Sequence, residues 1–123
     1  TRKEAFRFAF SGCWYMIKTQ KNTWIHAIAT ICVFAVAAWL QLQRIEWAIL
    51  ILTIGIVWLA EAVNTAVETT IDLCSPQKHP LAKIAKDTAA AAVLMAAITS
   101  VVIGLLILGP PLWAKIISWI PVS

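Results

Sequence analysis

Residues 88–108, TAAAAVLMAAITSVVIGLLIL, form an uncharged run of about 21 residues and decide the fold. A helix of roughly 20 apolar residues is long enough to cross the hydrocarbon core of a bilayer. Lys86 and Asp87 stand immediately before the run. The stretch therefore predicts a membrane-spanning helix over residues 86–108.

Two further spans are predicted upstream. Residues 24–40 are apolar apart from His26 and Thr30, at the lower length limit for a span. Residues 47–72 begin with an apolar run from Trp47 and continue in a helical pattern to Asp72. The segment 47–72 would be about 39 Å long, longer than the roughly 30 Å hydrocarbon core. We therefore expect its last turns to project from the membrane.

The composition agrees with a membrane protein. The sequence is 61% hydrophobic and only 13% charged, whereas soluble domains average about 45–50% apolar and 25% charged residues. A chain of 123 residues has too little interior to bury so much apolar surface in water. We find no internal repeat, linker or low-complexity tract. The sequence predicts an all-α membrane protein with one domain, residues 1–123.

Both ends of the sequence predict elements at the membrane surface. In residues 2–20, Phe6, Phe10 and Trp14 recur at helical spacing between basic residues. This pattern is typical of an amphipathic helix lying on the membrane. At the other end, we expect Pro110 and Pro111 to stop the last span. Residues 110–123 would then form a short interfacial tail.

Basic residues are distributed asymmetrically around the spans. Five precede the first span, three separate the second and third, and one lies between the first and second. These are Arg2, Lys3, Arg7, Lys18 and Lys21, then Lys78, Lys83 and Lys86, and finally Arg44. The positive-inside rule predicts a multi-pass protein of the cytoplasmic membrane, with the N-terminal end of this sequence in the cytoplasm. The net charge of +4 follows from this asymmetry, and we expect no nucleic acid partner.

The three cysteines, Cys13, Cys32 and Cys74, are odd in number and fall on predicted helices. We expect buried free thiols, and neither a disulfide nor a metal site.

A polar stripe follows one face of the second span. Glu61, Asn64, Glu68 and Asp72 are spaced 3, 4 and 4 residues apart. At about 100° per residue they fall within a sector of roughly 60°. Ionisable side chains within the bilayer are costly and mark candidate functional sites.

The start of the third span carries a matching polar face. Lys83, Lys86, Asp87 and Ala90 are spaced to share one side of a helix. Under the predicted topology this face enters the membrane from the cytoplasm, beside the end of the second span. We therefore expect carboxylates and lysines to meet at the inner interface, within reach of cytosolic ATP.

Spacing alone allows three interpretations of these residues. They could pair helices within a bundle or oligomer, conduct ions or protons, or form a catalytic metal–phosphate site. Phosphoryl transfer needs carboxylates for a divalent cation, cations for the phosphates, and a base for the attacking hydroxyl. Glu68, Lys86 and Glu61 offer these three roles, with the deeper Glu61 as general base. The sequence has no GxxxxGK[ST] motif, which excludes a P-loop kinase.

The order of these motifs resembles a known family. The run Glu61-Ala-Val-Asn64-Thr65-Ala-Val-Glu68-Thr-Thr-Ile-Asp72 is followed by His79 and then by Ala-Lys86-Asp87-Thr-Ala-Ala-Ala-Ala-Val. This ExxNTxxE…D…H…AKDxAxAAV pattern is similar to that of the prokaryotic diacylglycerol kinase and undecaprenol kinase family. The resemblance extends to about Leu108.

The resemblance implies a homotrimeric bundle with active sites between neighbouring subunits, and transfer of the ATP γ-phosphate to a lipid hydroxyl at the cytoplasmic leaflet. Glu61 would be the catalytic base and a substrate contact, placed with the help of Asn64. Glu68 would hold Mg²⁺, and Asp72 would support the site. The residues implied to contact ATP are Gln20, Glu68, Gln77, Lys78, His79, Lys86 and Asp87. Ala90 would lie on the lipid-substrate side, in place of a small hydroxyl residue of some relatives.

This sequence departs from the family pattern just before the first span. Many relatives have a Glu there as the second protein ligand of the metal, whereas this chain aligns Gln20. An amide oxygen can bind Mg²⁺ but contributes no charge, so weaker metal affinity is expected. The substrate implied is diacylglycerol or undecaprenol. The alternative function is that of a non-enzymatic membrane subunit or small ion or proton transporter using the same polar stripe.

Overall fold

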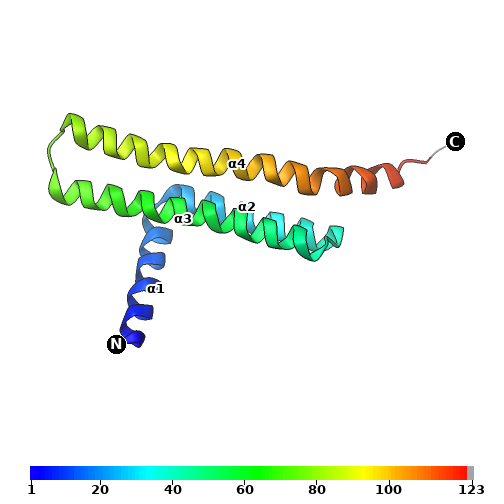
Figure 1. Cartoon of the computed structure of the whole chain (residues 1–123), viewed down its shortest axis with the longest axis horizontal. Coiled ribbons are helices and arrows are strands. Elements are labelled where there is room, and N and C mark those ends of the chain that lie inside the picture. Colours follow the sequence, from blue (N-terminus) through cyan, green and yellow to red (C-terminus); the bar gives the residue numbers. More distant parts are fainter. Residues whose placement is uncertain (122–123) are drawn as a thin grey trace.

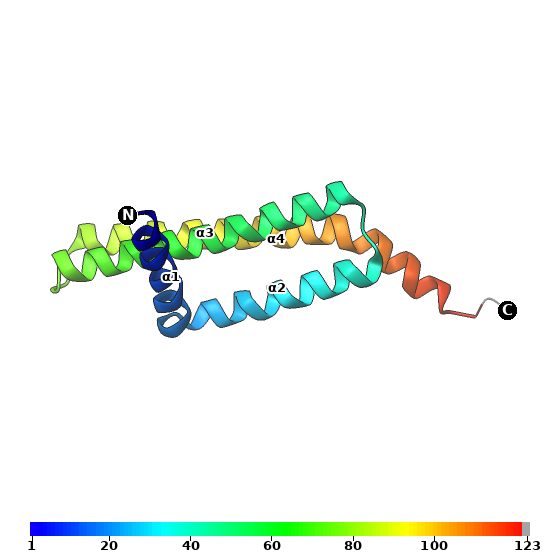
Figure 2. The same ribbon diagram turned by 90° about the horizontal axis from the view of Figure 1, so that it is seen from below.

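The computed structural model describes residues 1–121, which form four α-helices and no β-strand. These helices are α1 (Arg2–Thr19), α2 (Lys21–Leu40), α3 (Arg44–Cys74) and α4 (Pro80–Ser118). Helices α2, α3 and α4 run along a common direction, and α3 and α4 lie side by side and antiparallel (Figures 1 and 2). Helix α1 leaves this bundle sideways (Figure 1).

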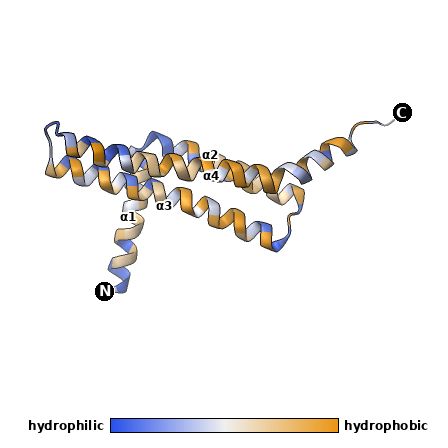
Figure 3. Cartoon of the chain, turned by 45° about the horizontal axis from the view of Figure 1, so that its top comes forward, coloured by the Kyte–Doolittle hydropathy of each residue, from blue (hydrophilic) through white to orange (hydrophobic). Residues whose placement is uncertain are grey.

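Three of the helices, α2, α3 and α4, are long and apolar enough to cross a membrane. Figure 3 shows hydrophobic residues concentrated in the middle of the bundle and hydrophilic ones toward the connections. The buried apolar side chains of the described residues are only Met16, Ala37, Leu50 and Val57. Most of the apolar surface therefore faces outward, as lipid permits and water does not. The all-α membrane fold predicted from the sequence is confirmed.

Helix α1 turns into α2 at Gln20, whose backbone is extended (φ −103°, ψ 117°). Gln20 caps both helices, because its N–H donates to the carbonyl of Met16 and its own carbonyl accepts from the N–H of Thr23. The fully buried Thr23 hydroxyl also donates to the Met16 carbonyl, at 3.3 Å. The corner therefore fixes α1 against α2 and places Gln20 beside α3.

Helix α3 contains 31 residues, about 46 Å of helix, and extends beyond the level of α1 (Figure 1). Its buried face includes Leu50, Val57, Glu61 and Asn64. The apolar part of this face, with Leu50 and Val57, is followed along the helix by the polar stripe that begins at Glu61. The packing that joins the helices also buries the first two members of the stripe.

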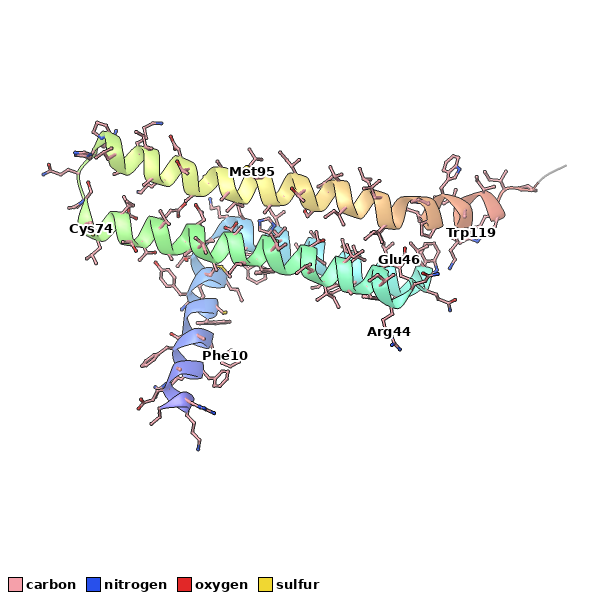
Figure 4. The ribbon with its side chains drawn as sticks, viewed as in Figure 1. Phe10, Arg44, Glu46, Cys74, Met95 and Trp119 are labelled. Carbon is pink, nitrogen blue, oxygen red and sulfur yellow. The ribbon has the colours of Figure 1, made fainter. Side chains whose placement is uncertain are left out.

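At the end of the bundle where α2 connects to α3, the last turns of α4 pack against the end of α2. Gln41 ends α2 in the left-handed conformation (φ 54°), a C-cap geometry that satisfies terminal carbonyls. Lys115 donates to the Trp39 carbonyl at 3.1 Å and lies 4.3 Å from the centroid of the Trp39 ring. Trp119 also contacts this ring, with 5.7 Å between centroids. Figure 4 shows Trp119, Arg44 and Glu46 at this end, and Cys74 at the other.

The expectation that Pro110 and Pro111 end the last helix is wrong. Helix α4 continues through both to Ser118, so residues 110–118 are helical and not a separate tail. The end of α4 bends away from the bundle axis (Figure 2). Each proline removes one N–H donor and crowds the carbonyl four residues earlier. A proline can kink a helix without ending it when other contacts stabilise the following turns. Here Lys115 and Trp119 provide such contacts with Trp39.

The expectation of buried thiols is also corrected. Cys13, Cys32 and Cys74 are free, as predicted, but all three are exposed on the isolated chain. A thiol behaves as a small apolar group, so exposure to lipid is compatible with its chemistry.

Candidate active site

The most buried carboxylate of the described residues is that of Glu61 on α3. Its side chain is 1% exposed, and its Oε2 atom has no hydrogen-bond partner among the described residues. The nearest ionisable group is His26 of α2, whose Nε2 lies 3.4 Å from that oxygen. The Glu61 backbone carbonyl accepts from the Thr65 hydroxyl at 3.0 Å. The structure therefore holds a buried carboxylate that is incompletely paired.

Two turns further along α3, Glu68 lies between two amides. Asn64 Nδ2 donates to Glu68 Oε1 at 3.1 Å, and Gln20 Nε2 lies 3.5 Å from Glu68 Oε2. The corner between α1 and α2 thus brings Gln20 to the stripe, although it is 48 residues away in sequence. Asn64 Oδ1 is buried and has no hydrogen-bond partner within residues 1–121. The group therefore contains one carboxylate that faces the N–H groups of two side-chain amides.

The third pair joins the ends of α3 and α4. Lys86 Nζ donates to Asp72 Oδ1 at 2.5 Å, across the connection. One turn earlier, Lys83 Nζ donates to Asp87 Oδ2 at 2.6 Å. Both pairs are largely exposed, so water screens them and each stabilises the fold only weakly. The two lysines are therefore available to exchange their carboxylate partners for an anionic ligand.

A cleft of about 660 Å³ opens at this end of the bundle. The residues that line it include Asp72, Gln77, Lys78, His79, Lys86 and Asp87. His79 has a structural role here, because its Nδ1 accepts the Leu81 N–H at 3.1 Å and caps α4. Pro80 at the first helical position needs no such partner. The connection is thereby held at the mouth of the cleft.

Ala90 lies in a different cleft, of about 270 Å³, between α2 and α4. Asn22 and His26 line it from α2, and Leu94 and Ala97 line it from α4. His26 lines this cleft, and its Nε2 also lies 3.4 Å from Glu61 Oε2. His26 is therefore near both Ala90 and Glu61.

The structure brings residues predicted from the sequence together in three groups along α3. Glu61 lies beside His26, Glu68 contacts Gln20 and Asn64, and Asp72 contacts Lys86. His26 is not among the site residues predicted from the sequence. One signal was present, because an ionisable residue inside a predicted span is itself a candidate functional residue.

The Glu68 group fits a hard divalent cation only with help from another ligand. Mg²⁺ prefers oxygen donors and is commonly held by one or two carboxylates together with substrate phosphates. Glu68 provides a carboxylate, and Gln20 can provide an amide oxygen after rotation of its side chain. Among residues 1–121, no three Asp, Glu, His or Cys side chains cluster as a metal site. These donors are therefore compatible with a divalent cation whose remaining ligands are phosphate oxygens of a bound nucleotide.

Taken together, three spanning helices and a buried acidic stripe beside a lysine-lined cleft define a membrane-integrated protein with a polar site at one end. The family described as prokaryotic diacylglycerol kinase matches residues 7–108 of the chain. The chain belongs to this family of membrane-integrated kinases.

Individual relatives support this assignment. The chain is 46% identical over 109 residues to a diacylglycerol kinase of Synechocystis, which covers 88% of this chain. It is 43% identical over 109 residues to the undecaprenol kinase of Bacillus subtilis, covering 89% of both chains. A diacylglycerol kinase of Escherichia coli is 30% identical over 95 residues, 72% of this chain and 78% of its own length. The match spans 62% of the length of the Synechocystis relative.

Proposed function

We propose that this protein transfers the γ-phosphate of ATP to the hydroxyl of a membrane lipid, either diacylglycerol or undecaprenol. The observation that carries the proposal is the buried, incompletely paired Glu61 carboxylate on the same stripe as Glu68 and the Asp72–Lys86 pair. The relatives named above are all lipid kinases by name, and they give no support to the transporter alternative.

Glu61 is the proposed general base. It lies seven residues from Glu68, about 10 Å along the helix, so a lipid hydroxyl and a γ-phosphate fit between them. Glu61 takes the hydroxyl proton as the lipid oxygen forms its bond to phosphorus. Asn64 lies between the two glutamates on α3 and donates to Glu68, and we assign it a supporting role in placing the catalytic groups.

Glu68 and Gln20 are the proposed protein ligands of Mg²⁺. When bound, the cation neutralises charge on the phosphates during transfer. The nucleotide itself occupies the 660 Å³ cleft in this proposal, with Lys86 on its phosphates. Without a nucleotide, Lys86 pairs with Asp72. When ATP binds, a phosphate replaces Asp72 as the partner of the Lys86 ammonium group.

The remaining nucleotide contacts are proposed for Gln77, Lys78, His79 and Asp87, which line the same cleft. His79 already accepts the Leu81 N–H through Nδ1, so only its Nε2 is free for a nucleotide. Ala90 faces the cleft between α2 and α4, which we assign to the lipid substrate.

The oligomer and orientation belong to the same proposal. No residue of α4 is buried in the single chain, so this helix has apolar surface for neighbouring subunits or lipid. A homotrimer with sites shared between subunits would place the α4 lysines of one chain beside the acidic stripe of another. The basic residues favour an inner, cytoplasmic membrane location, with α1 and the α3–α4 connection in the cytoplasm, where ATP is present.

A direct assay tests the function. The purified protein in mixed micelles receives labelled ATP, Mg²⁺ and one lipid alcohol at a time. We expect labelled lipid phosphate with diacylglycerol, undecaprenol or both, in a Mg²⁺-dependent reaction. The two relatives with the higher identity are named for different substrates, so both lipids are tested. Unchanged ATP with every lipid, from folded protein, would contradict the proposal and favour a non-enzymatic membrane subunit.

The Gln20→Glu variant tests the metal ligands. A second carboxylate beside Glu68 adds charge to the cation site. We expect the Mg²⁺ concentration for half-maximal activity to fall about tenfold, equivalent to roughly 1.4 kcal/mol. The measurement is a Mg²⁺ titration of lipid phosphorylation at saturating ATP. Gln20→Ala serves as the control and should raise the same concentration. An identical Mg²⁺ dependence in all three proteins would remove Gln20 from the metal site.

A further inference from the structure

The Glu61 carboxylate is buried where it needs a hydrogen-bond donor. Its side chain is 1% exposed, and a buried ionised carboxylate without a donor is strongly unfavourable. The stripe itself does not supply that donor, because Asn64 donates to Glu68 instead. The partner of Glu61 therefore has to come from another helix.

Helix α2 offers one candidate, His26. Its Nε2 lies 3.4 Å from Glu61 Oε2, slightly beyond hydrogen-bond distance. Catalytic hydrogen bonds are often long before substrate binds and shorten in the reactive complex. His26 is the only titratable side chain that lines either of its two neighbouring cavities, so no other charge competes for the contact.

The surroundings of His26 restrict its ring. Trp58 of α3 packs against it edge-on, with 6.5 Å between ring centroids. The Trp58 indole N–H donates to the Thr30 hydroxyl at 3.1 Å, and that hydroxyl donates to the His26 carbonyl at 2.7 Å. The ring is thus positioned by a chain of contacts that leaves its Nε2 facing Glu61.

The other side of the ring faces the cleft that contains Ala90. The His26 side chain is 17% exposed, whereas Glu61 is 1% exposed. His26 therefore lies beside the proposed base, Glu61, and also lines the cleft that we assign to the lipid substrate.

From this geometry we propose that His26 is a positioning residue, which donates its Nε2–H to Glu61 Oε2 and aims Oε1 at the lipid hydroxyl. This inference rests on the proposed function. In the reaction, the hydroxyl proton moves to Glu61 Oε1 and the lipid oxygen bonds to the γ-phosphorus. The bond from that phosphorus to the bridging oxygen breaks, and its electron pair leaves with ADP. His26 keeps its proton throughout.

Two substitutions of similar size separate this role from packing. His26→Leu removes the donor, and we expect kcat to fall about 10- to 100-fold, the range for a hydrogen bond to a charged group. His26→Gln keeps an N–H in nearly the same place, and we expect kcat within about threefold of the parent protein. KM for ATP should be unchanged in both, because the nucleotide cleft does not include His26.

Thr53→Val is the matched control, since it removes a buried hydroxyl of α3 that donates to the Ile49 carbonyl and forms no hydrogen bond with His26 or Glu61. It should leave kcat nearly unchanged. A parental kcat in His26→Leu would overturn the proposal. So would equal losses in His26→Leu, His26→Gln and Thr53→Val, accompanied by lower thermal midpoints, because that pattern indicates packing alone. A parent protein without any lipid phosphorylation refutes instead the proposed function.

Discussion

The Glu61→Gln variant is expected to lose about 10²- to 10⁴-fold in kcat for lipid phosphorylation, the range for removal of a general base. The amide has nearly the shape of the carboxylate and can still face His26, so the bundle should fold. It cannot accept the hydroxyl proton. The measurement is the initial rate of labelled lipid phosphate formation at saturating ATP and Mg²⁺, with KM for ATP determined in parallel.

Glu46→Gln is the matched control. Glu46 is also on α3, but it lies at the opposite end of the bundle (Figure 4), where its Oε1 accepts the Gln43 N–H at 3.2 Å. A glutamine can accept the same hydrogen bond, and we expect parental activity. Should Glu61→Gln retain parental kcat, Glu61 is not the base. Loss of activity in both variants would instead indicate a general effect of altering α3.

A mixture of two inactive variants is expected to recover about a quarter of parental activity, if each site in a ring of subunits uses α3 of one chain and α4 of its neighbour. The variants are Glu61→Gln and Lys86→Met. In a random one-to-one mixture, about one site in four pairs an intact Glu61 with an intact Lys86. The experiment unfolds the oligomers in denaturing detergent, mixes the chains, reassembles them and measures lipid phosphorylation.

The result distinguishes shared sites from sites within one chain. Each variant alone, treated identically, should stay inactive. A site built within one subunit yields no recovery, because every chain then carries one defect. In that case Lys86, which contacts Asp72 of the same chain, would bind the nucleotide that the same chain uses. Reassembly of the parent protein to full activity is the control for the procedure.

Much of this fold was predictable because the membrane imposes simple requirements. Every backbone polar group in lipid must be paired within a helix, so the apolar run at 88–108 could adopt little else. The predicted spans 24–40, 47–72 and 86–108 lie within α2, α3 and α4, which begin three to six residues earlier. The predicted surface helix 2–20 corresponds to α1. Where the prediction failed, at Pro110 and Pro111, contacts of Lys115 and Trp119 with Trp39 hold turns that local rules would have ended.

The sequence by itself determined the helices, the stripe and which residues share a face, because helical periodicity depends only on spacing along the chain. Only the tertiary structure decided which side chains meet. The corner at Gln20 brings its amide to Glu68, and the packing of α2 on α3 brings His26 to Glu61. Such pairings depend on how helices rotate and slide against each other, which side-chain packing between helices sets and no single helix encodes.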